Sequence, residues 1–440
     1  MYTEKIRKAL KSLPTEIEDE FPLEMPLLDD FRKAHVRGSD SLSHLEVLFI
    51  QHHLGPFLLR LNSLFDEGLK PEKTWLVDIP YSTNERVRQE IPKRFGVPHF
   101  QIAPPFRDPI APYAMLQLQR VKHIVYHLAN RLSQSPLLVV DDGAYFIRAL
   151  KDIDTLEPGF ARAFKGQTVI VEQTTRGHRY LEEEGCKNFV ERVVEAPVVS
   201  IARCNTKTEV EAPFIGAAAS RAAVKTFKSE GIDINSLGQI AIIGFGPVGE
   251  AVFQALRVFN HQYPIRVVDT DIGKHTKIAD FGGIPLESLP GKGNFDLVVG
   301  CTGYSSFDLS DWKCLSENAM LASCSSAAVE FNRKKFVDLA ELYPDDQIVL
   351  IEKEKTRQKG IHATVKIQNL DTNQQVSFLN ASFPINFDGR MECLPVRYIQ
   401  ATHTLLYAAM YQVLETSKPG MTGIDPKVDA EISENAMKYI

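Results

Sequence analysis

Cysteine is scarce in this chain. Its 440 residues include six cysteines, which are scattered and form no CxxC pair. Disulfide-dependent secreted domains and most structural zinc sites need closely spaced cysteines. The sequence therefore excludes a disulfide scaffold. Its cysteine usage is typical of a reducing compartment, so we expect a cytoplasmic protein.

Two further features are missing. No run approaches the ~18 apolar residues that a membrane span requires. Acidic side chains outnumber basic ones, 56 against 50, for a net charge of -6, whereas nucleic-acid-binding proteins usually have a basic excess. Residues 1–7 alternate in charge and do not resemble the apolar segment of a signal peptide. We therefore expect no membrane and no nucleic acid as partner.

A metal site is not expected either. His123 and His127 are four residues apart on a predicted helix, a spacing that can bind zinc. No general-base glutamate and no third ligand accompany them in the sequence. We therefore interpret the two histidines as part of a helix surface and predict no metal.

Short apolar runs alternate with longer amphipathic stretches in the first half of the chain. Residues 74–79, 137–140 and 168–171 are typical of buried strands. Strands that alternate with helices form a parallel sheet, whose functional residues collect beyond the carboxyl ends of the strands. The candidate functional segments are therefore residues 80–84, 141–143 and 172–177.

A second α/β unit follows. Residues 239–243 predict a strand, 244–249 a glycine-rich turn and 250–260 a helix. Further predicted strands are residues 265–268, 296–299, 319–322 and 348–351. Because 440 residues exceed one ordinary core, we predict two doubly wound, parallel-sheet α/β domains. Residues 1–212 form the first, 213–356 form a second domain inserted in it, and 357–440 return to the first and end in a tail.

The turn at 244–249 has the pattern GxGxxG. It lies between a strand and a helix, and Asp269 follows 20 residues beyond Gly249, which is the context of a dinucleotide-binding fingerprint. An aspartate there accepts from a ribose 2'-hydroxyl and repels a 2'-phosphate, which favours NAD over NADP. The alternative is a glycine turn that has lost its ligand. The predicted NAD-binding residues of this Rossmann domain are Gly244, Gly246, Pro247, Val248, Gly249 and Asp269, with Cys301, Thr302 and Gly303 on the nicotinamide side.

Several separated motifs resemble one family. Residues 141–143, 172–177, 205–207, 244–249 and 301–303 occur in an order and spacing similar to those of S-adenosyl-L-homocysteine hydrolase, over roughly residues 45 to 410. The resemblance implies a substrate domain built from both ends of the chain, an inserted NAD domain, and a hinge on either side.

The resemblance also implies a mechanism. NAD oxidises the ribose 3' carbon transiently, a carboxylate removes the 4' hydrogen, the 5' group is eliminated, water adds and the hydride returns. Lys207 would deprotonate the 3'-hydroxyl, and Asp142, with Asp141 beside it, would act at the 4' carbon. His53 would lie near the leaving group, while Thr174 and Thr175 would contact NAD.

The predicted substrate pocket departs from the family. Gln173 replaces a glutamate, Glu211 an aspartate, and Phe57 a glutamate that reads the adenine amino group. Further departures are Ala212 for an asparagine, Asn386 for a histidine, and residues 325–328 for a Gly-His-Phe-Asp run. We therefore predict a nucleoside-like or polyhydroxylated small molecule as substrate, in place of S-adenosylhomocysteine.

Two other functions are compatible with the sequence. One is an NAD-dependent dehydrogenase that releases NADH, and the other is a catalytically silent NAD-binding regulatory protein. A homo-oligomer is also compatible with it. The non-catalytic interpretations of the candidate residues are an exposed lysine for Lys207, a helix N-cap pair for Asp141 and Asp142, and packing for His53.

Overall fold

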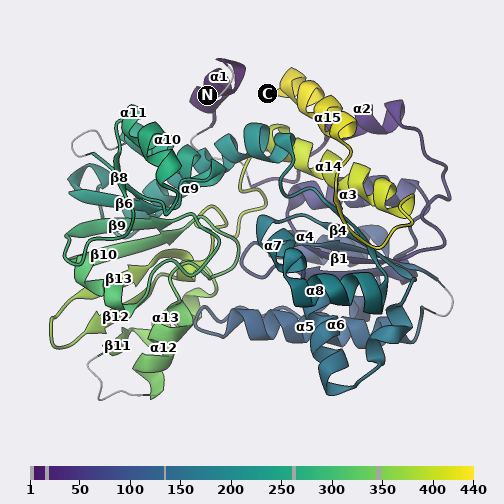
Figure 1. The fold of residues 1–440 in the computed structure, drawn as a ribbon, viewed down its shortest axis with the longest axis horizontal. Coiled ribbons are helices and arrows are strands. Elements are labelled where there is room, and N and C mark those ends of the chain that lie inside the picture. Colours follow the sequence, from purple (N-terminus) through teal and green to yellow (C-terminus); the bar gives the residue numbers. More distant parts are fainter. Residues whose placement is uncertain (1–3, 15–18, 133–134, 260–263, 343–347) are drawn as a thin grey trace. The chain divides into compact units, whose positions relative to one another are not determined.

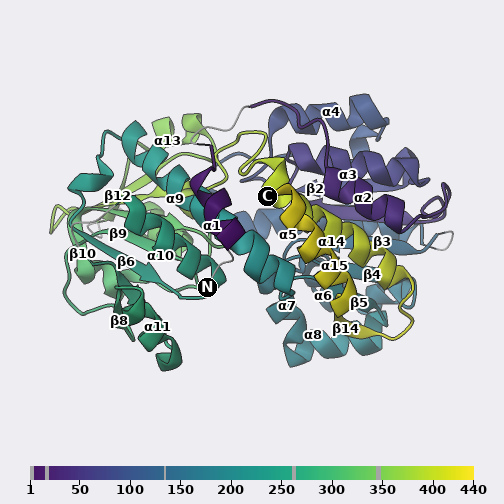
Figure 2. The ribbon, with the colours of Figure 1, turned by 90° about the horizontal axis from the view of Figure 1, so that it is seen from above.

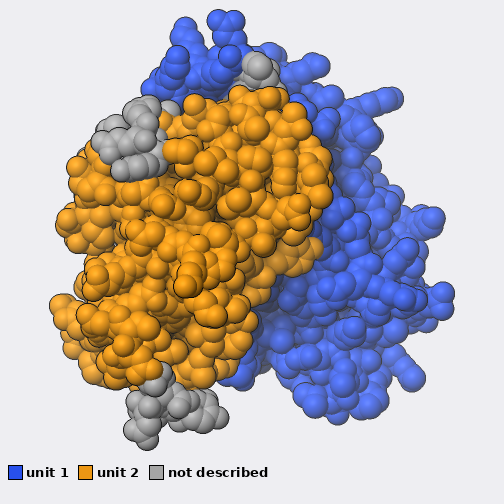
Figure 3. All heavy atoms as spheres, turned by 60° about the vertical axis from the view of Figure 1, so that its left-hand side comes forward, with its two compact units in different colours: residues 1–106, 114–211, 390–440 blue, residues 107–113, 212–389 orange. Residues whose placement is uncertain are grey.

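The computed structural model describes residues 4–14, 19–132, 135–259, 264–342 and 348–440. The chain divides into two compact units, which Figure 3 colours separately. Unit 1 comprises residues 1–106, 114–211 and 390–440, and unit 2 comprises residues 107–113 and 212–389. Apart from the short segment 107–113, unit 2 is thus an insertion in the sequence of unit 1.

Unit 1 contains a parallel sheet (Figure 1). In the described ranges it has six strands in the order β14-β5-β4-β3-β1-β2, and each neighbouring pair is parallel. β1 and β3 are buried along their whole length, as expected for a parallel sheet covered on both faces. The strands are β1 (Glu46–Gln51), β2 (Thr74–Asp78), β3 (Leu137–Asp141), β4 (Thr168–Glu172), β5 (Pro197–Ser200) and β14 (Gly420–Gly423).

The helices of unit 1 begin and end at residues that suit those positions. α4, for example, begins after Asn84, whose side chain accepts hydrogen bonds from two backbone N–H groups, and ends at Gly96 with φ +70°. Figures 1 and 2 show the helices in two views. They are α1 (Glu4–Lys11), α2 (Pro26–Ala34), α3 (Gly55–Asp66), α4 (Glu85–Phe95), α5 (Tyr113–Ala129), α6 (Tyr145–Leu156), α7 (Thr175–Glu182), α8 (Glu184–Asn188), α14 (Val396–Leu414) and α15 (Pro426–Tyr439).

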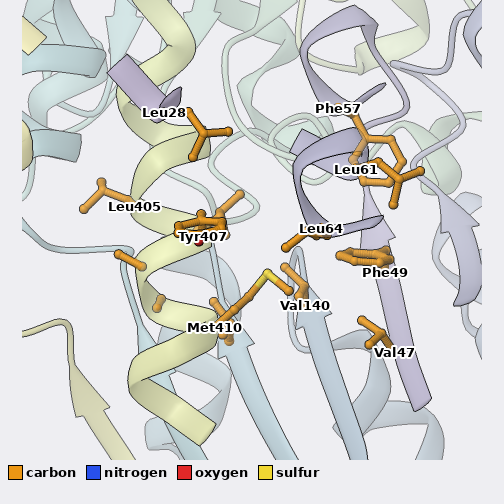
Figure 4. Packing of buried hydrophobic residues seen from close by; sticks show 14 of the residues in the cluster. Leu28, Val47, Phe49, Phe57, Leu61, Leu64, Val140, Leu405, Tyr407 and Met410 are labelled. Carbon is orange, nitrogen blue, oxygen red and sulfur yellow. The ribbon is translucent and has the colours of Figure 1, made fainter. Parts of the chain in front are cut away.

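The core of unit 1 needs the C-terminal segment. α14 packs against β3, β4 and β5 and against α2 and α3. Figure 4 shows Met410 of α14 directed toward Leu64 and Val140, with Tyr407 and Leu405 along the same helix. Residues 390–440 therefore supply part of the apolar core of a unit that begins near the other end of the chain.

Unit 2 has the strand order of a Rossmann domain. In its described residues an eight-stranded sheet has the order β11-β12-β13-β10-β9-β6-β7-β8. The strands from β8 to β13 follow the order 3-2-1-4-5-6 of a dinucleotide-binding sheet, and β12 and β11 extend it in antiparallel fashion. The strands are β6 (Gln239–Ile243), β7 (Arg266–Val268), β8 (Ile284–Leu286), β9 (Phe295–Gly300), β10 (Leu315–Ser323), β11 (Ile348–Ile351), β12 (Val365–Asn369) and β13 (Gln375–Phe378).

The helices of unit 2 include the one that follows the glycine-rich turn. The predicted helix at 250–260 begins earlier, at Pro247, and Asn260 lies outside the described residues. The helices are α9 (Ala212–Ser229), α10 (Pro247–Phe259), α11 (His275–Asp280), α12 (Arg333–Leu342) and α13 (Lys353–Lys359). None of the helices in the described ranges is both long and apolar enough to cross a membrane.

The predicted fold class is confirmed, with a change in one domain boundary. Two α/β units with parallel sheets are present, and one is inserted in the other. The expected return to the first domain at residue 357 is wrong, because residues 357–389 belong to unit 2 and the return comes at 390. β12 and β13 lie in this stretch, and β13 pairs with β10 of the Rossmann sheet.

Candidate functional site

The glycine-rich turn of unit 2 has the backbone that a dinucleotide requires. Gly244 follows β6 and has φ +94°, in the left-handed region. A Cβ atom at Gly249 would lie 2.0 Å from the Gly244 carbonyl oxygen, so only glycine fits there. A Cβ atom at Gly246 would meet no described atom within 4 Å. The backbone is therefore open at Gly246, directly before Pro247 and Val248, the first residues of α10. Because the N-terminus of a helix attracts anions, the turn and the start of α10 fit a pyrophosphate.

Asp269 follows β7 at the predicted ribose position. Its carboxylate accepts hydrogen bonds from the N–H groups of Phe245 (2.7 Å) and Asp271 (2.9 Å) and pairs with Lys274 (3.0 Å). Burial raises the pKa of Asp269, but these three donors outweigh it and hold the pKa below its usual range. The side chain is therefore a fixed anion, and Lys274 offsets part of its charge.

The turn at 301–303 is held by Glu330, which the sequence reasoning missed. This buried carboxylate accepts hydrogen bonds from the N–H groups of Thr302 and Gly303 (both 2.6 Å) and from the Thr302 hydroxyl (2.9 Å). The Ser325 hydroxyl donates to the same carboxylate. A Cβ atom at Gly300 would lie 2.8 Å from Glu330 Oε2. The divergent run at 325–328 thus belongs to a network that supports the turn.

Cys301 and Asn386 complete the predicted residues of unit 2. The Cys301 N–H donates to the Ile243 carbonyl (2.8 Å). A hydrogen bond with Cys324, and then burial, raise the pKa of the Cys301 thiol well above its usual range, which suits a packing residue better than a nucleophile. Asn386 is buried in unit 2, whereas Phe57 belongs to unit 1. The predicted substrate residues are therefore divided between the units.

The candidate residues of unit 1 lie where its strand order reverses. The chain passes from β1 to β2 on one side and places β3, β4 and β5 on the other, so the switch point lies between β1 and β3. The carboxyl ends of the strands at such a point are the usual ligand site of an open α/β sheet. His52 follows β1 and Asp142 follows β3, so the topology brings these two residues together.

His52 connects two polar groups. Its Nδ1 lies 2.6 Å from the Ser82 hydroxyl, and its Nε2 lies 3.2 Å from Asp142 Oδ2. Because the Ser82 hydroxyl donates to the Ile79 carbonyl (2.9 Å), it accepts from His52, and Nδ1 carries a proton. Nε2 therefore faces a carboxylate oxygen that has no hydrogen-bond partner among the described residues. The sequence reasoning selected Asp142 but not His52.

His53 is fully buried, and its ring nitrogens have no hydrogen-bond partner among the described residues. Its ring stacks on Phe57 at 5.0 Å between centroids and an angle of 9°. Burial lowers the pKa of His53 to about 3, so the ring is neutral. Phe57, predicted for the substrate, is a core residue that also packs against Phe49 (Figure 4). In this structure it supports His53.

Asp141 and Glu172 form a buried carboxylate pair at the ends of β3 and β4. Burial raises the pKa of Asp141 to about 7, and burial together with the charge of Asp141 raises that of Glu172. Asp141 accepts hydrogen bonds from Tyr145 N–H (3.1 Å) and Phe146 N–H (2.8 Å), whereas Glu172 accepts from Gly143 (3.1 Å), Ala144 (2.9 Å) and Thr174 (2.7 Å). The bonds of Asp141 to the first turn of α6 favour its interpretation as a helix cap.

The segment after β4 shows how its polar residues are used. The Thr174 hydroxyl accepts from the Gly177 N–H (2.9 Å) at the start of α7 and donates to Glu172 (2.8 Å). Thr175 is exposed as the first residue of α7. Gln173 Oε1 is a buried atom without a donor in the part of the chain that the structure describes, so Gln173 retains a polar atom for a ligand.

Lys207 and Glu211 form an ion pair. They lie one turn apart in the short π-helix η5 (Thr206–Glu211), and their side chains are 16% and 9% exposed. Asp429 of α15 accepts from the N–H groups of Asn205 (2.8 Å) and Thr206 (3.1 Å), which fixes the start of η5. The pair places a basic and an acidic side chain next to each other beyond β5.

The two histidines of α5 are used in packing. His123 and His127 are in edge-to-face contact at 4.8 Å between centroids, and His127 stacks on Trp75. Over the described ranges, no cluster of His, Cys, Asp or Glu side chains is arranged to hold a metal ion.

Similar sequences are distant. No protein-family model matches the chain. Two uncharacterized proteins from different strains of Mycobacterium tuberculosis are each 25% identical to it over 374 residues, which cover 84% of this chain. The chain spans 63% of the length of these relatives.

Similar solved structures have low scores. A phosphoglycerate oxidoreductase from Vibrio cholerae is 12% identical, with a TM-score of 0.40 over 84% of this chain and 98% of that one. An NAD-dependent formate dehydrogenase from Staphylococcus aureus in complex with NAD is 11% identical, with a TM-score of 0.31 over 49% of this chain and 64% of that one. None of these named proteins is an S-adenosyl-L-homocysteine hydrolase, so that assignment rests on the sequence motifs alone.

Proposed function

We propose that the chain is an NAD-dependent oxidoreductase that acts on a hydroxylated small molecule. The observation that supports this most directly is the turn at 244–249, where the backbone is open at Gly246 and a fixed carboxylate, Asp269, follows the next strand. A ribose 2'-hydroxyl can donate to that carboxylate, whereas a 2'-phosphate is repelled by it. This favours NAD over NADP.

The residues of unit 2 would bind the cofactor. The turn at 244–249 and the N-terminus of α10 would hold the pyrophosphate, and Asp269 the adenosine ribose. The turn at 301–303, fixed by Glu330, would line the nicotinamide side. When bound, NAD supplies the acceptor for a hydride from an alcohol carbon.

The residues of unit 1 would handle the protons of the substrate. Lys207, with Glu211 beside it, would take the proton of the hydroxyl group that is oxidised. His52, whose Nε2 lies 3.2 Å from Asp142 Oδ2, would form a second acid–base group with that carboxylate. His53 offers uncharged ring nitrogens for a hydrogen bond. Positioned acid–base groups contribute ~10²–10⁴ to a rate.

A second candidate is transient oxidation followed by elimination on a nucleoside-like substrate, as in S-adenosyl-L-homocysteine hydrolase. It is favoured by the presence of two separate pairs of acidic and basic side chains, Lys207 with Glu211 in η5 and His52 with Asp142 beyond β1 and β3. A dehydrogenase needs one base at the reacting hydroxyl, whereas elimination also needs a group that removes a proton from the neighbouring carbon.

The nucleotide that co-purifies with the chain tests both candidates. We expect NAD, quantified with NADH after denaturation of the protein. With a panel of hydroxylated compounds and an excess of added NAD, a dehydrogenase releases many NADH per chain. An elimination reaction reduces at most the one bound NAD per chain and restores it.

The variant Gly249→Ala should bind NAD poorly because its Cβ atom collides with the turn. Gly38→Ala is the matched control, since a Cβ there meets no described atom within 4 Å. NAD bound without any redox change would identify a regulatory protein. Failure of the wild type to bind NAD would contradict the proposal.

A further inference from the structure

Arg60 of α3 is a buried cation with no counter-ion in the part of the chain that the structure describes. Its side chain has no exposed surface, and within the described residues no carboxylate pairs with it. Nη2 donates to Gln51 Oε1 (2.9 Å), whereas Nε and Nη1 have no acceptor there. Because Nη1 carries two protons and Nε one, three N–H bonds of this guanidinium are unsatisfied.

An unpaired buried charge of this kind is unusual. Buried charges in proteins are normally paired, because an ion that leaves water without a partner loses much of its solvation energy. The Phe57 ring lies 5.5 Å from the Arg60 guanidinium carbon and offers only a weak cation–π interaction. Burial lowers the pKa of Arg60 to about 9, so it remains a cation at neutral pH. None of the described residues therefore neutralises this positive charge.

Arg60 lies beside the switch point of unit 1. Its partner Gln51 is the last residue of β1, directly before His52. His403 of α14 is close to both this region and η5. Burial lowers the pKa of His403 well below its usual range, and the charges of Arg60, Lys207 and His52 lower it further. Its Nδ1 is a further buried atom for which the described residues provide no hydrogen-bond partner.

The neighbouring basic side chains have acidic partners. Lys207 is paired with Glu211, and His52 with Asp142, but Arg60 has no such partner. The unsatisfied N–H bonds and the unpaired charge therefore belong to the same group. This group lies next to the strand ends where a ligand of an open α/β sheet binds.

We propose that Arg60 binds an anionic group, a carboxylate or a phosphate, of the ligand that unit 1 recognises. Such an oxyanion has several acceptor oxygens and supplies both the missing hydrogen bonds and the missing charge. The inference rests on the proposed function in one respect, namely that this ligand is the substrate. The substrate is then a hydroxylated compound that carries an anionic group.

Thermal unfolding of the 440-residue chain, freed of bound NAD, tests this inference. The probes are sodium phosphate and sodium lactate, each compared with sodium chloride at equal ionic strength. The variants are Arg60→Met, which removes the charge, and Arg60→Lys, which keeps the charge but not the guanidinium. Arg94→Met is the matched control, because Arg94 is exposed on α4.

We expect phosphate, lactate or both to raise the Tm of the wild type and of Arg94→Met in a saturable manner. The apparent affinity should be roughly 10- to 100-fold weaker in both Arg60 variants, the loss typical of a charged hydrogen bond. A response to phosphate alone identifies a phosphate group, a response to lactate alone identifies a carboxylate, and a response to both identifies a general oxyanion site.

In chloride alone, Arg60→Met should melt above the wild type, because it removes an uncompensated buried charge. The proposal is overturned if neither anion raises the wild-type Tm, or if Arg60→Met retains the anion response. Should Arg60→Met not fold, Arg60→Lys decides by the same criterion. Because NAD is absent from these titrations, they are independent of the outcome of the NAD experiments.

Discussion

Replacing His53 should remove a pH-dependent part of the stability of unit 1. In the folded protein the pKa of this buried ring is about 3, whereas histidine in an unfolded chain titrates near pH ~6.5. Below that pH the unfolded state binds a proton that the folded state does not, so acidification favours unfolding. Between pH ~7.5 and ~5.0 the difference amounts to about 2 kcal/mol, because each pKa unit corresponds to about 1.4 kcal/mol.

The assay compares the wild type with His53→Leu. Leucine has a volume similar to that of histidine, but its side chain is apolar and does not titrate. Both proteins carry Trp312→Phe, so that Trp75 in β2 reports urea unfolding of unit 1, since the chain has two tryptophans. The pH dependence of the unfolding free energy is compared between the two proteins, because Asp141 changes that free energy in the opposite direction to His53. Its raised pKa, about 7, lets the folded state bind a proton on acidification, and both proteins share this effect.

We expect the wild type to lose about 2 kcal/mol more unfolding free energy than His53→Leu between pH ~7.5 and ~5.0. His99→Leu is the control for replacing a histidine by leucine at an exposed position, and it should keep the wild-type dependence. Equal losses in the wild type and His53→Leu would refute the reasoning, because His53 would then be solvated or paired in the folded protein.

Four further predictions follow from the two units. Calorimetric titration should show NAD binding roughly 100-fold or more tightly than NADP because of Asp269, and Lys274→Ala should widen this preference by removing the nearby ammonium; tighter binding of NADP would reverse the cofactor assignment. Lys207→Ala should reduce substrate oxidation by ~10²–10⁴ with NAD affinity unchanged, and wild-type reduction of bound NAD would make Lys207 a structural residue. S-adenosylhomocysteine should react at least ~10⁴-fold more slowly than the true substrate, because Phe57 provides no carboxylate for the adenine amino group; rapid release of homocysteine in a thiol assay would contradict this. Labelled NAD should exchange within minutes when the protein is diluted into unlabelled NAD. In S-adenosyl-L-homocysteine hydrolase a lysine and a tyrosine from the C-terminal end of a neighbouring subunit close the NAD site, whereas here the C-terminal helix α15 packs on its own unit 1 through Asp429. Retention of the label for hours would disprove this prediction.

Most strands could be predicted from local apolar runs, and those that could not depend on distant partners. β1 contains the apolar run 47–50, a local signal like that of the predicted strands, but its first residue, Glu46, is acidic and depends on distant partners. Glu46 is accommodated by Trp75, whose indole N–H donates to it at 2.7 Å, and by Arg131 at 2.9 Å. β12 and β13 contain alternating polar residues, and their place in the sheet depends on the pairing of β13 with β10.

The residues of the candidate site also differ in whether the sequence could predict them. The glycine turn and Asp269 could be predicted because the fingerprint is local in sequence. Glu330 could not, because it acts on Thr302 from 28 residues away, and Asp429 acts on Thr206 from 223 residues away. Arg60 has no motif, and what distinguishes it is the missing counter-ion, which only the folded chain reveals.

The position of α14 has a consequence for the synthesis of the chain on the ribosome. Unit 2 has all of its strands once residue 389 has been added, whereas unit 1 still lacks α14 and the edge strand β14. Domains generally fold as units during synthesis. We therefore expect unit 2 to fold first. The strands of unit 1 that are synthesised earlier have an incomplete core until α14 has been added. A chain that ends before residue 390 should retain a folded unit 2 and expose the apolar surface that α14 normally covers.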